Sequence, residues 1–225
     1  MRHGKGVRTA MISTSLSQIA DVLGGRLVLR REDAPDTTVA GQVDTDSRLI
    51  EPGGIFVAKP GETTDGHLFI GAAIERGAAL AIVERGLDDD VSQVVVSDIV
   101  DALAALARDN VARVRAAGGL KIVGITGSNG KTTTKNMLAR ILEDEGPTVS
   151  PRASFNNEVG APLTMLRVEH DTRFLVSEFG ASAPGAIARL AGLVTPDVAS
   201  SSWSAWPTPA GSAASNRPST PRASS

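Results

Sequence analysis

The stretch IVGITGSNGKTTTK, from Ile122 to Lys135, decides how the rest of the chain is interpreted. Its first half is a run of β-branched residues typical of a buried strand, and its second half is a glycine turn followed by Lys131 and Thr132. A strand, a glycine turn and a helix start in that order predict a phosphate-binding loop. Glycines let the backbone approach a phosphate closely, and the N-terminus of the next helix adds its positive dipole end.

The loop predicts roles for its side chains. Lys131 is expected to reach the terminal phosphates of a nucleotide, and the Thr132 hydroxyl is expected to hold Mg²⁺. The strict motif requires glycine where this chain has Ile125, so the match is to the shorter form GxxGKT. A glycine turn followed by a chance Lys-Thr is the alternative, but apolar residues at helical spacing downstream (Met137, Leu138, Ile141 and Leu142) argue against it. The predicted cofactor-binding residues are Thr126, Gly127, Ser128, Asn129, Gly130, Lys131, Thr132 and Thr133.

Composition excludes several classes of protein. With 225 residues, 41% of them apolar, the chain can bury a core in one or two domains. Its net charge of −2 provides no basic surface for nucleic acid, and the absence of cysteine excludes disulfides and thiolate metal sites. No apolar run approaches the ~18 residues that span a bilayer. We therefore expect a cytoplasmic monomer without nucleic-acid or membrane partners.

Strands and helices alternate along the chain, which indicates an α/β fold. A capping box at Ser15 to Gln18 opens the first helix and Gly24 ends it, while Ser97 is expected to cap a helix that ends at Gly118. We expect a disordered extension (1–10), a small α/β domain (11–117), an incomplete phosphate-loop α/β domain with a mostly parallel sheet (118–199) and a disordered tail (200–225).

The second domain places a carboxylate beside the predicted loop. A strand from Arg173 to Ser177 delivers Glu178 at its C-terminal end, the edge of a parallel sheet where ligands bind. Glu178 is therefore expected to complete the coordination of the metal on Thr132. The segment from Ser154 to Thr164 is predicted to be a loop, because it is rich in Asn, Ser and Gly.

Three blocks of this sequence resemble the Mur ligases, the ATP-dependent ligases of peptidoglycan synthesis. DSR at Asp46, PGGIFVA at Pro52 and DGHLF at Asp65 together resemble the family's N-terminal UDP-sugar domain, so 11–117 is expected to be that domain. TGSNGKTTT at Thr126 resembles the family's ATP loop. SFNNEVGAPLT at Ser154 resembles the branch that joins D-Ala-D-Ala to UDP-N-acetylmuramoyl-tripeptide, and the resemblance covers residues 11 to 199.

The resemblance implies a mechanism and a set of residues. The terminal carboxylate of UDP-N-acetylmuramoyl-tripeptide would attack the γ-phosphate of ATP, and the amine of D-Ala-D-Ala would then displace phosphate from the acyl phosphate. Catalytic roles are implied for Lys131, Asn156 and Asn157, and metal binding for Thr132 and Glu178. Sugar-nucleotide binding is implied for Ser47, Arg48, Asp65, Gly66 and His67. Turn formation is an equal alternative for the two asparagines, and turn or surface roles are the alternative for Ser47, Arg48 and His67.

The sequence departs from the family after Ala199. The family's histidine segment, modified lysine, adenine region and C-terminal domain have no counterpart here, so we expect this chain alone not to catalyse ligation. The tail from Ser200 contains no acidic residue and is rich in Ser, Ala and Pro, and we hypothesise that it is a frameshift product. A non-catalytic nucleotide- or UDP-sugar-binding module, a tripeptide-forming Mur ligase and a folylpolyglutamate synthetase are the alternative functions. The block at Ser154 argues against the last two.

Overall fold

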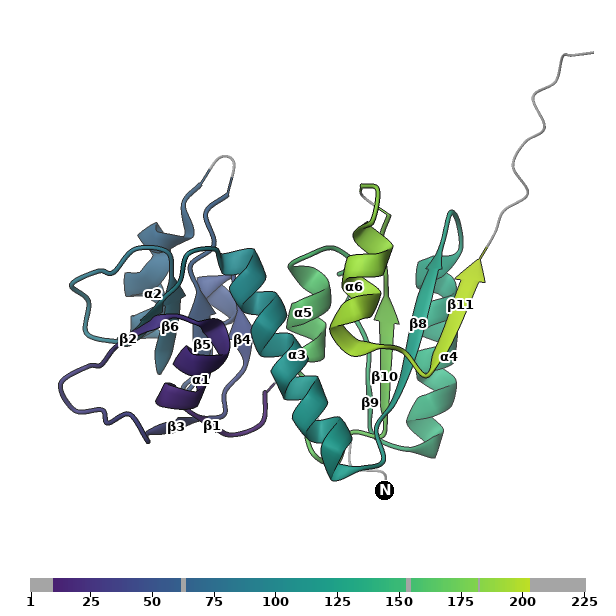
Figure 1. Cartoon of the computed structure of the whole chain (residues 1–225), viewed down its shortest axis with the longest axis horizontal. Coiled ribbons are helices and arrows are strands. Elements are labelled where there is room, and N and C mark those ends of the chain that lie inside the picture. Colours follow the sequence, from purple (N-terminus) through teal and green to yellow (C-terminus); the bar gives the residue numbers. More distant parts are fainter. Residues whose placement is uncertain (1–9, 62–63, 153–154, 182, 203–225) are drawn as a thin grey trace, which may run out of the picture.

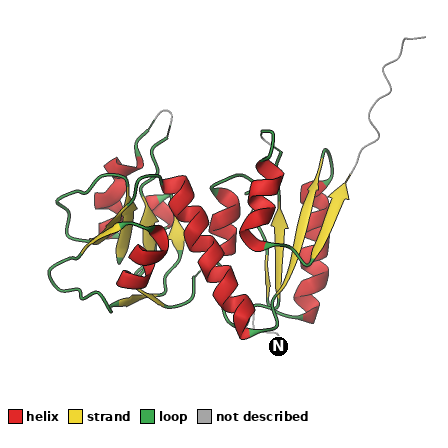
Figure 2. Cartoon of the chain, viewed as in Figure 1, coloured by secondary structure: helices red, strands yellow, loops and turns green. Residues whose placement is uncertain are grey.

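The computed structural model describes residues 10–61, 64–152, 155–181 and 183–202. Two α/β units lie side by side along the long axis of the molecule, and the long helix α3 (Ile99–Ala117) runs between their sheets (Figure 1). Each unit has a mostly parallel sheet with helices packed on it (Figure 2). The α/β class expected from the alternation of strands and helices is therefore confirmed.

The first unit is built on a five-stranded sheet in the order β2-β7-β6-β5-β4. Its strands are β2 (Arg26–Val28), β4 (Val43–Asp44), β5 (Ile55–Val57), β6 (Leu80–Val83) and β7 (Ser92–Val95), and only the β2–β7 pair is antiparallel. Successive strand residues face opposite sides, so Ile55 packs with α1 (Leu16–Leu23) and α3, whereas Phe56 packs with α2 (Ile70–Glu75). Both faces are buried, which explains the uninterrupted apolar runs of β5 and β6.

Local signals define the ends of these elements. Ser15 and Gln18 form the expected capping box of α1, and Gly24 ends the helix in the left-handed conformation (φ 58°). The N-cap of α3 is Asp98, whose side chain accepts a hydrogen bond from the Asp101 amide, so the expected cap at Ser97 was one residue early. The remaining short elements are β1 (Thr14–Ser15), β3 (Thr38–Val39) and two 3₁₀ helices, η1 (Ser47–Leu49) and η2 (Gly66–Phe69).

The second unit is a four-stranded parallel sheet in the order β11-β8-β10-β9. Its strands are β8 (Lys121–Gly127), β9 (Thr148–Val149), β10 (Phe174–Glu178) and β11 (Val198–Ser202). Helix α4 (Lys131–Glu145) packs on one face, while α5 (Gly160–Met165) and α6 (Ala186–Val194) lie on the other, between the sheet and α3 (Figure 1).

Helix α3 joins the two units. Its buried stripe includes Leu103, Leu106 and Val114, which belong to one apolar core that extends from α1 to α5 and α6. Asn110, on the same stripe, is 1% exposed and links both sides through its side chain. Its Oδ1 accepts from the Ile12 amide (3.2 Å), and its Nδ2 donates to the carbonyls of Met165 (3.2 Å) and Val168 (2.9 Å). The expected boundary at residue 117 therefore marks a change of sheet within a continuous core.

The structure corrects three expected boundaries. Residues 160–165 form helix α5, although the segment to Thr164 was predicted to be a loop. Strand β11 continues to Ser202, beyond the expected end of the domain at Ala199, because its last residues pair with β8. Ala10 pairs with Gln42 and is not part of a free extension. Residues 1–9 and 203–225 lie outside the described residues, so the disorder and the frameshift expected there remain predictions. No helix in the described ranges has the length and apolar character to cross a membrane.

Candidate nucleotide-binding site

The predicted loop connects β8 to α4, and its two glycines serve different purposes. Gly127 (φ 136°) is approached closely by β11, since a Cβ there would lie 2.0 Å from the Ser202 carbonyl oxygen. Gly130 is the N-cap of α4 with φ 77°, and a Cβ added to it would meet no atom within 4 Å. Gly127 thus allows chain packing, while Gly130 provides a left-handed backbone next to open space, as a phosphate-binding turn requires.

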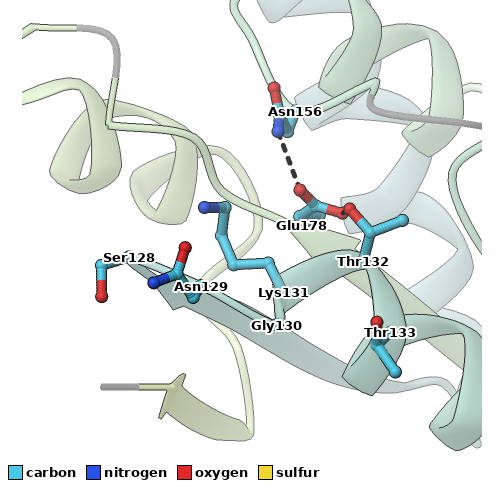
Figure 3. A pocket seen from close by; sticks show the side chains of 8 residues that line it. All are labelled: Ser128, Asn129, Gly130, Lys131, Thr132, Thr133, Asn156 and Glu178. Carbon is cyan, nitrogen blue, oxygen red and sulfur yellow. Dashed lines mark hydrogen bonds between the residues drawn. The ribbon is translucent and has the colours of Figure 1, made fainter. Parts of the chain in front are cut away.

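A pocket of about 300 Å³ opens at this loop. It is lined by Ser128, Asn129, Gly130, Lys131, Thr132, Thr133, Asn156 and Glu178, whose side chains are shown in Figure 3. The Lys131 ammonium donates a hydrogen bond to the Gly127 carbonyl (2.7 Å), so the side chain is folded back over the loop. Six of the eight predicted cofactor-binding residues line this pocket. The other two, Thr126 and Gly127, lie beneath it, where the Thr126 hydroxyl donates to the Phe179 carbonyl (3.0 Å).

Glu178 lies at the end of β10, beside the loop that connects β8 to α4. The parallel pairing of β10 with β8 places it opposite Ile125, and its side chain is almost fully buried. One carboxylate oxygen accepts from the Thr132 hydroxyl (3.1 Å), and the other accepts from the Asn156 amide (2.8 Å), the bond dashed in Figure 3. The structure therefore brings together the two residues predicted to hold the metal.

The oxygen atoms of Thr132 and Glu178 suit Mg²⁺. In the described part of the chain, no group of three or more His, Cys, Asp or Glu residues forms a metal cluster. Proteins commonly bind Mg²⁺ through one or two carboxylates together with the phosphates of a nucleotide and water. The donor set is thus a partial one that a bound nucleotide would complete.

The two adjacent asparagines have different roles. Asn156 faces the pocket, and its backbone carbonyl accepts from the Gly180 amide (2.8 Å), which ties it to the end of β10. The Asn157 side chain instead accepts from the amides of Val159 (3.2 Å) and Gly160 (2.8 Å) at the start of α5. The alternative of a turn former therefore describes Asn157, and the structure does not bring that side chain to the pocket.

Two residues at the site had no role in the sequence analysis. Ser202 closes over the loop from β11, since its carbonyl accepts from the Ser128 amide (3.1 Å) and its hydroxyl donates to the Thr126 carbonyl (3.2 Å). Lys135 is 1% exposed and donates to the Pro151 carbonyl (2.9 Å). Burial lowers the pKa of Lys135, and the nearby Glu178 carboxylate opposes this in part. Its spacing of four residues from Lys131 was the available signal, because that spacing places both on one face of α4.

The residues predicted to bind a sugar nucleotide lie in the first unit. Ser47 is buried at the start of η1, and the exposed Arg48 pairs with Asp46 (2.7 Å). Their ligand role is not tested by this arrangement and remains a prediction. Gly66 is packed tightly, because a Cβ there would lie 2.6 Å from the Lys59 carbonyl oxygen.

His67 is buried and both of its ring nitrogens are engaged within the protein. Nδ1 donates to Asp65 (2.7 Å), and Nε2 accepts from the Glu84 amide (3.1 Å). Asp65 also accepts from Arg85 (2.6 Å) and from the His67 amide (3.0 Å). These bonds hold the pKa of Asp65 well below its usual range, with the His67 amide as the largest cause. In this structure the pair Asp65–His67 fastens η2 to the end of β6.

Two family models match the chain. The model described as "Mur ligase family, catalytic domain" matches residues 41–125, and "Mur ligase middle domain" matches residues 125–201. Together they cover most of the described residues, and their junction lies in β8, immediately before the loop.

Several proteins named UDP-N-acetylmuramoyl-tripeptide--D-alanyl-D-alanine ligase are similar to this chain. The one from Mycobacterium leprae (strain TN) is 39% identical over 210 residues, 84% of this chain and 40% of that protein. The one from Escherichia coli (strain K12) is 39% identical over 189 residues, which again are 84% of this chain and 40% of that protein. The chain thus spans about 40% of the length of these relatives.

Solved structures of similarly named ligases also superimpose on this chain. The structure of UDP-N-acetylmuramoylalanyl-D-glutamyl-2,6-diaminopimelate--D-alanyl-D-alanyl ligase from Acinetobacter baumannii superimposes with a TM-score of 0.73 at 34% identity, covering 88% of this chain and 42% of that one. MurF ligase from Thermotoga maritima, solved in complex with ADP, superimposes with a TM-score of 0.58 at 36% identity over 69% of this chain and 35% of that one.

Proposed function

The chain belongs to the Mur ligase family, and from this we propose that it forms the ATP-binding part of a ligase that adds D-Ala-D-Ala to UDP-N-acetylmuramoyl-tripeptide. One observation carries the proposal: the Glu178 carboxylate accepts hydrogen bonds from both Thr132 and Asn156 beside the glycine loop. The oxygen atoms of Thr132 and Glu178 are ligands that Mg²⁺ prefers, and the side-chain amide of Asn156 is a neutral hydrogen-bond donor for phosphate oxygens.

The residues of the pocket have distinct parts in this function. Bound ATP would supply the phosphoryl group that activates the substrate carboxylate. Lys131 would leave the Gly127 carbonyl and bind the terminal phosphates, since a phosphate is a stronger acceptor for an ammonium than a neutral carbonyl. Thr132 and Glu178 would hold Mg²⁺, and the N-terminus of α4 would add its dipole. The chain thus provides positioning and electrostatic stabilisation, the main contributions of proteins to phosphoryl transfer.

Nucleotide titration tests this proposal. A non-hydrolysable ATP analogue is titrated into the wild type, Lys131→Ala and Thr132→Ala, with and without Mg²⁺, and Asn136→Ala, exposed on α4 outside the pocket, is the control. Loss of a charge-assisted bond is worth about 1.5 to 3 kcal/mol, so Lys131→Ala should weaken binding about 10- to 100-fold. Thr132→Ala should reduce the gain that Mg²⁺ provides while leaving metal-free binding nearly unchanged. Equal affinity in all four proteins would show that the loop is only a structural turn.

The ligand role of the first unit is tested separately. UDP-N-acetylmuramoyl-tripeptide is titrated into the wild type and into Arg48→Ala, with Arg31→Ala, which is also exposed, as the control. Arg48 is exposed and, among the described residues, its ion pair is with Asp46, so its removal should change stability little. Weaker binding by Arg48→Ala alone supports the predicted substrate site. Binding equal to that of the control would remove Arg48 from it.

A further inference from the structure

A second cavity lies where the two units meet. Strand β4 and Leu49 form its wall in the first unit. Arg152, Phe155 and the α5 region as far as Arg167 form the wall in the second unit. Its volume is about 70 Å³, enough for one small polar group of a ligand, and we call it the inter-unit cleft.

Two arginines, Arg152 and Arg167, line the wall of the cleft in the second unit. Arg167 is partly buried and donates to the Ser150 carbonyl (2.9 Å). Burial, with a further contribution from the positive charge of Arg152, lowers the pKa of Arg167 to about 10. Arg152 is exposed, and within the described ranges it forms no ion pair. Two positively charged residues therefore line one cleft, and an anion bound beside them would offset their mutual repulsion.

The opposite wall carries one carboxylate. Asp44, at the end of β4, accepts from the Asp46 amide (2.9 Å), and burial raises its pKa, although Arg152 opposes this. Among the described residues, no ion pair joins Asp44 to Arg152 or Arg167. The cleft thus offers two donors for an oxyanion on one wall and an acceptor for a hydroxyl or amide N–H on the other.

The cleft and the nucleotide pocket share a short segment of chain. Phe155 lines the cleft, and the next residue, Asn156, lines the nucleotide pocket and donates to Glu178. A ligand held in the cleft therefore lies next to a segment that also borders the site proposed for ATP. A molecule that carries both an oxyanion and hydroxyl or amide groups, and that reacts at the nucleotide, fits this placement.

We propose that Arg152 and Arg167 form an oxyanion subsite that holds one anionic group of the sugar-peptide substrate in the inter-unit cleft, with Asp44 accepting a hydrogen bond from an adjacent hydroxyl or amide. The inference rests on the proposed function for the identity of the ligand. The oxyanion is either a peptide carboxylate or a phosphate of the diphosphate, since a guanidinium binds both in the same forked geometry. Arg152 and Arg167 bind the substrate here and take no part in bond making.

Calorimetric titration of the full chain tests the subsite. The probes are UDP, UDP-N-acetylmuramic acid and UDP-N-acetylmuramoyl-tripeptide, and the variants are Arg152→Gln and Arg167→Lys. Arg140→Gln is the matched control, because Arg140 is exposed on α4 and paired with Glu143 away from both cavities. Arg152→Gln changes an exposed residue without an ion pair, so it should fold normally even if Arg167→Lys does not. We expect Arg152→Gln to weaken tripeptide-substrate binding at least 10-fold and Arg140→Gln to change it less than twofold.

The probes separate the two sources of the oxyanion. Weaker binding of all three probes by Arg152→Gln assigns the subsite to the diphosphate, and weaker binding of the tripeptide probe alone assigns it to a peptide carboxylate. Equal binding of every probe by Arg152→Gln and the wild type overturns the inference while leaving the proposed function intact. Failure of the wild type to bind any probe overturns the sugar-nucleotide part of the proposed function and the inference with it. An ATP-analogue affinity that falls with Arg152→Gln also overturns the separate subsite, because the two cavities would then act as one.

Discussion

Replacement of Asn110 by Ala should loosen the junction between the two units. The side chain is 1% exposed and makes three hydrogen bonds, to the Ile12 amide and to the carbonyls of Met165 and Val168. Each is worth about 1 kcal/mol net, and some of the three backbone groups would be left buried without a partner. The higher helix propensity of Ala offsets at most about 0.7 kcal/mol of this loss. We therefore expect a loss of about 3 kcal/mol in the free energy of unfolding, a large fraction of the stability of a typical protein.

Urea unfolding followed by circular dichroism measures this loss. A change of 3 kcal/mol corresponds to a fall in Tm of roughly 6 to 12 °C for a chain of this size. Asp109→Ala is the control, because Asp109 is the neighbouring residue on α3 and, in the part of the chain that the structure describes, its ion pair is a long one with Arg113 (3.5 Å). A loss for Asn110→Ala within about 0.5 kcal/mol of that control would refute the reasoning. It would mean that water satisfies the freed groups or that the units unfold independently.

Three further predictions concern single residues. Gly66→Ala should destabilise by about 1 to 3 kcal/mol, because its Cβ would meet the Lys59 backbone at 2.6 Å, whereas Gly71→Ala, with no atom within 4 Å, should be neutral or stabilising in the same urea titration. Asp65 has a pKa below its ordinary value of 3.8, so the stabilisation that its carboxylate provides is present above that pH and is lost as the pH falls. The free energies of unfolding of the wild type and Asp65→Asn should therefore converge on acidification. A constant gap between them would contradict this. Lys135 has a pKa below its ordinary value of 10.5, so at alkaline pH the unfolded chain binds more protons than the folded chain. The free energy of unfolding of the wild type should therefore gain a component that rises with pH in that range, and Lys135→Met should lack this component. Identical pH slopes for the two proteins would show that the buried ammonium is not the cause.

Sequence reasoning located the pocket at the glycine loop because its signals are local. The run of β-branched residues, the glycine turn and the helical spacing after Lys131 all act within a few residues, and β8 and α4 begin and end close to where these patterns predict. The position of Glu178 could also be predicted, since the ends of neighbouring parallel strands meet at one edge of a sheet. The same local chemistry predicted the caps of α1, and it erred by one residue at Asp98, because Ser97 and Asp98 are both good N-caps.

Tertiary structure decided which chemically similar residues face the pocket and which are used elsewhere. Asn156 and Asn157 are identical neighbours in sequence, and only the course of the backbone into α5 turns one toward Glu178 and the other toward the Gly160 amide. Burial of Lys135 depends on the carbonyl of Pro151, 16 residues away, and no local pattern encodes such a partner. His67, predicted to bind a ligand, is engaged through contacts with Asp65 and the more distant Glu84.

The sequence by itself determined most of the elements of this protein, their order and the strand, glycine turn and helix start at Lys131, because strand, turn and cap preferences arise from short-range sterics and hydrogen bonds. Three features arose only in the folded chain. Helix α3 joins the two units, Ser202 pairs with the loop, and Arg152 and Arg167 line one cleft. Each of these depends on contacts between residues far apart in sequence. Their formation is governed by the burial of apolar surface around a shared core, which no single segment specifies.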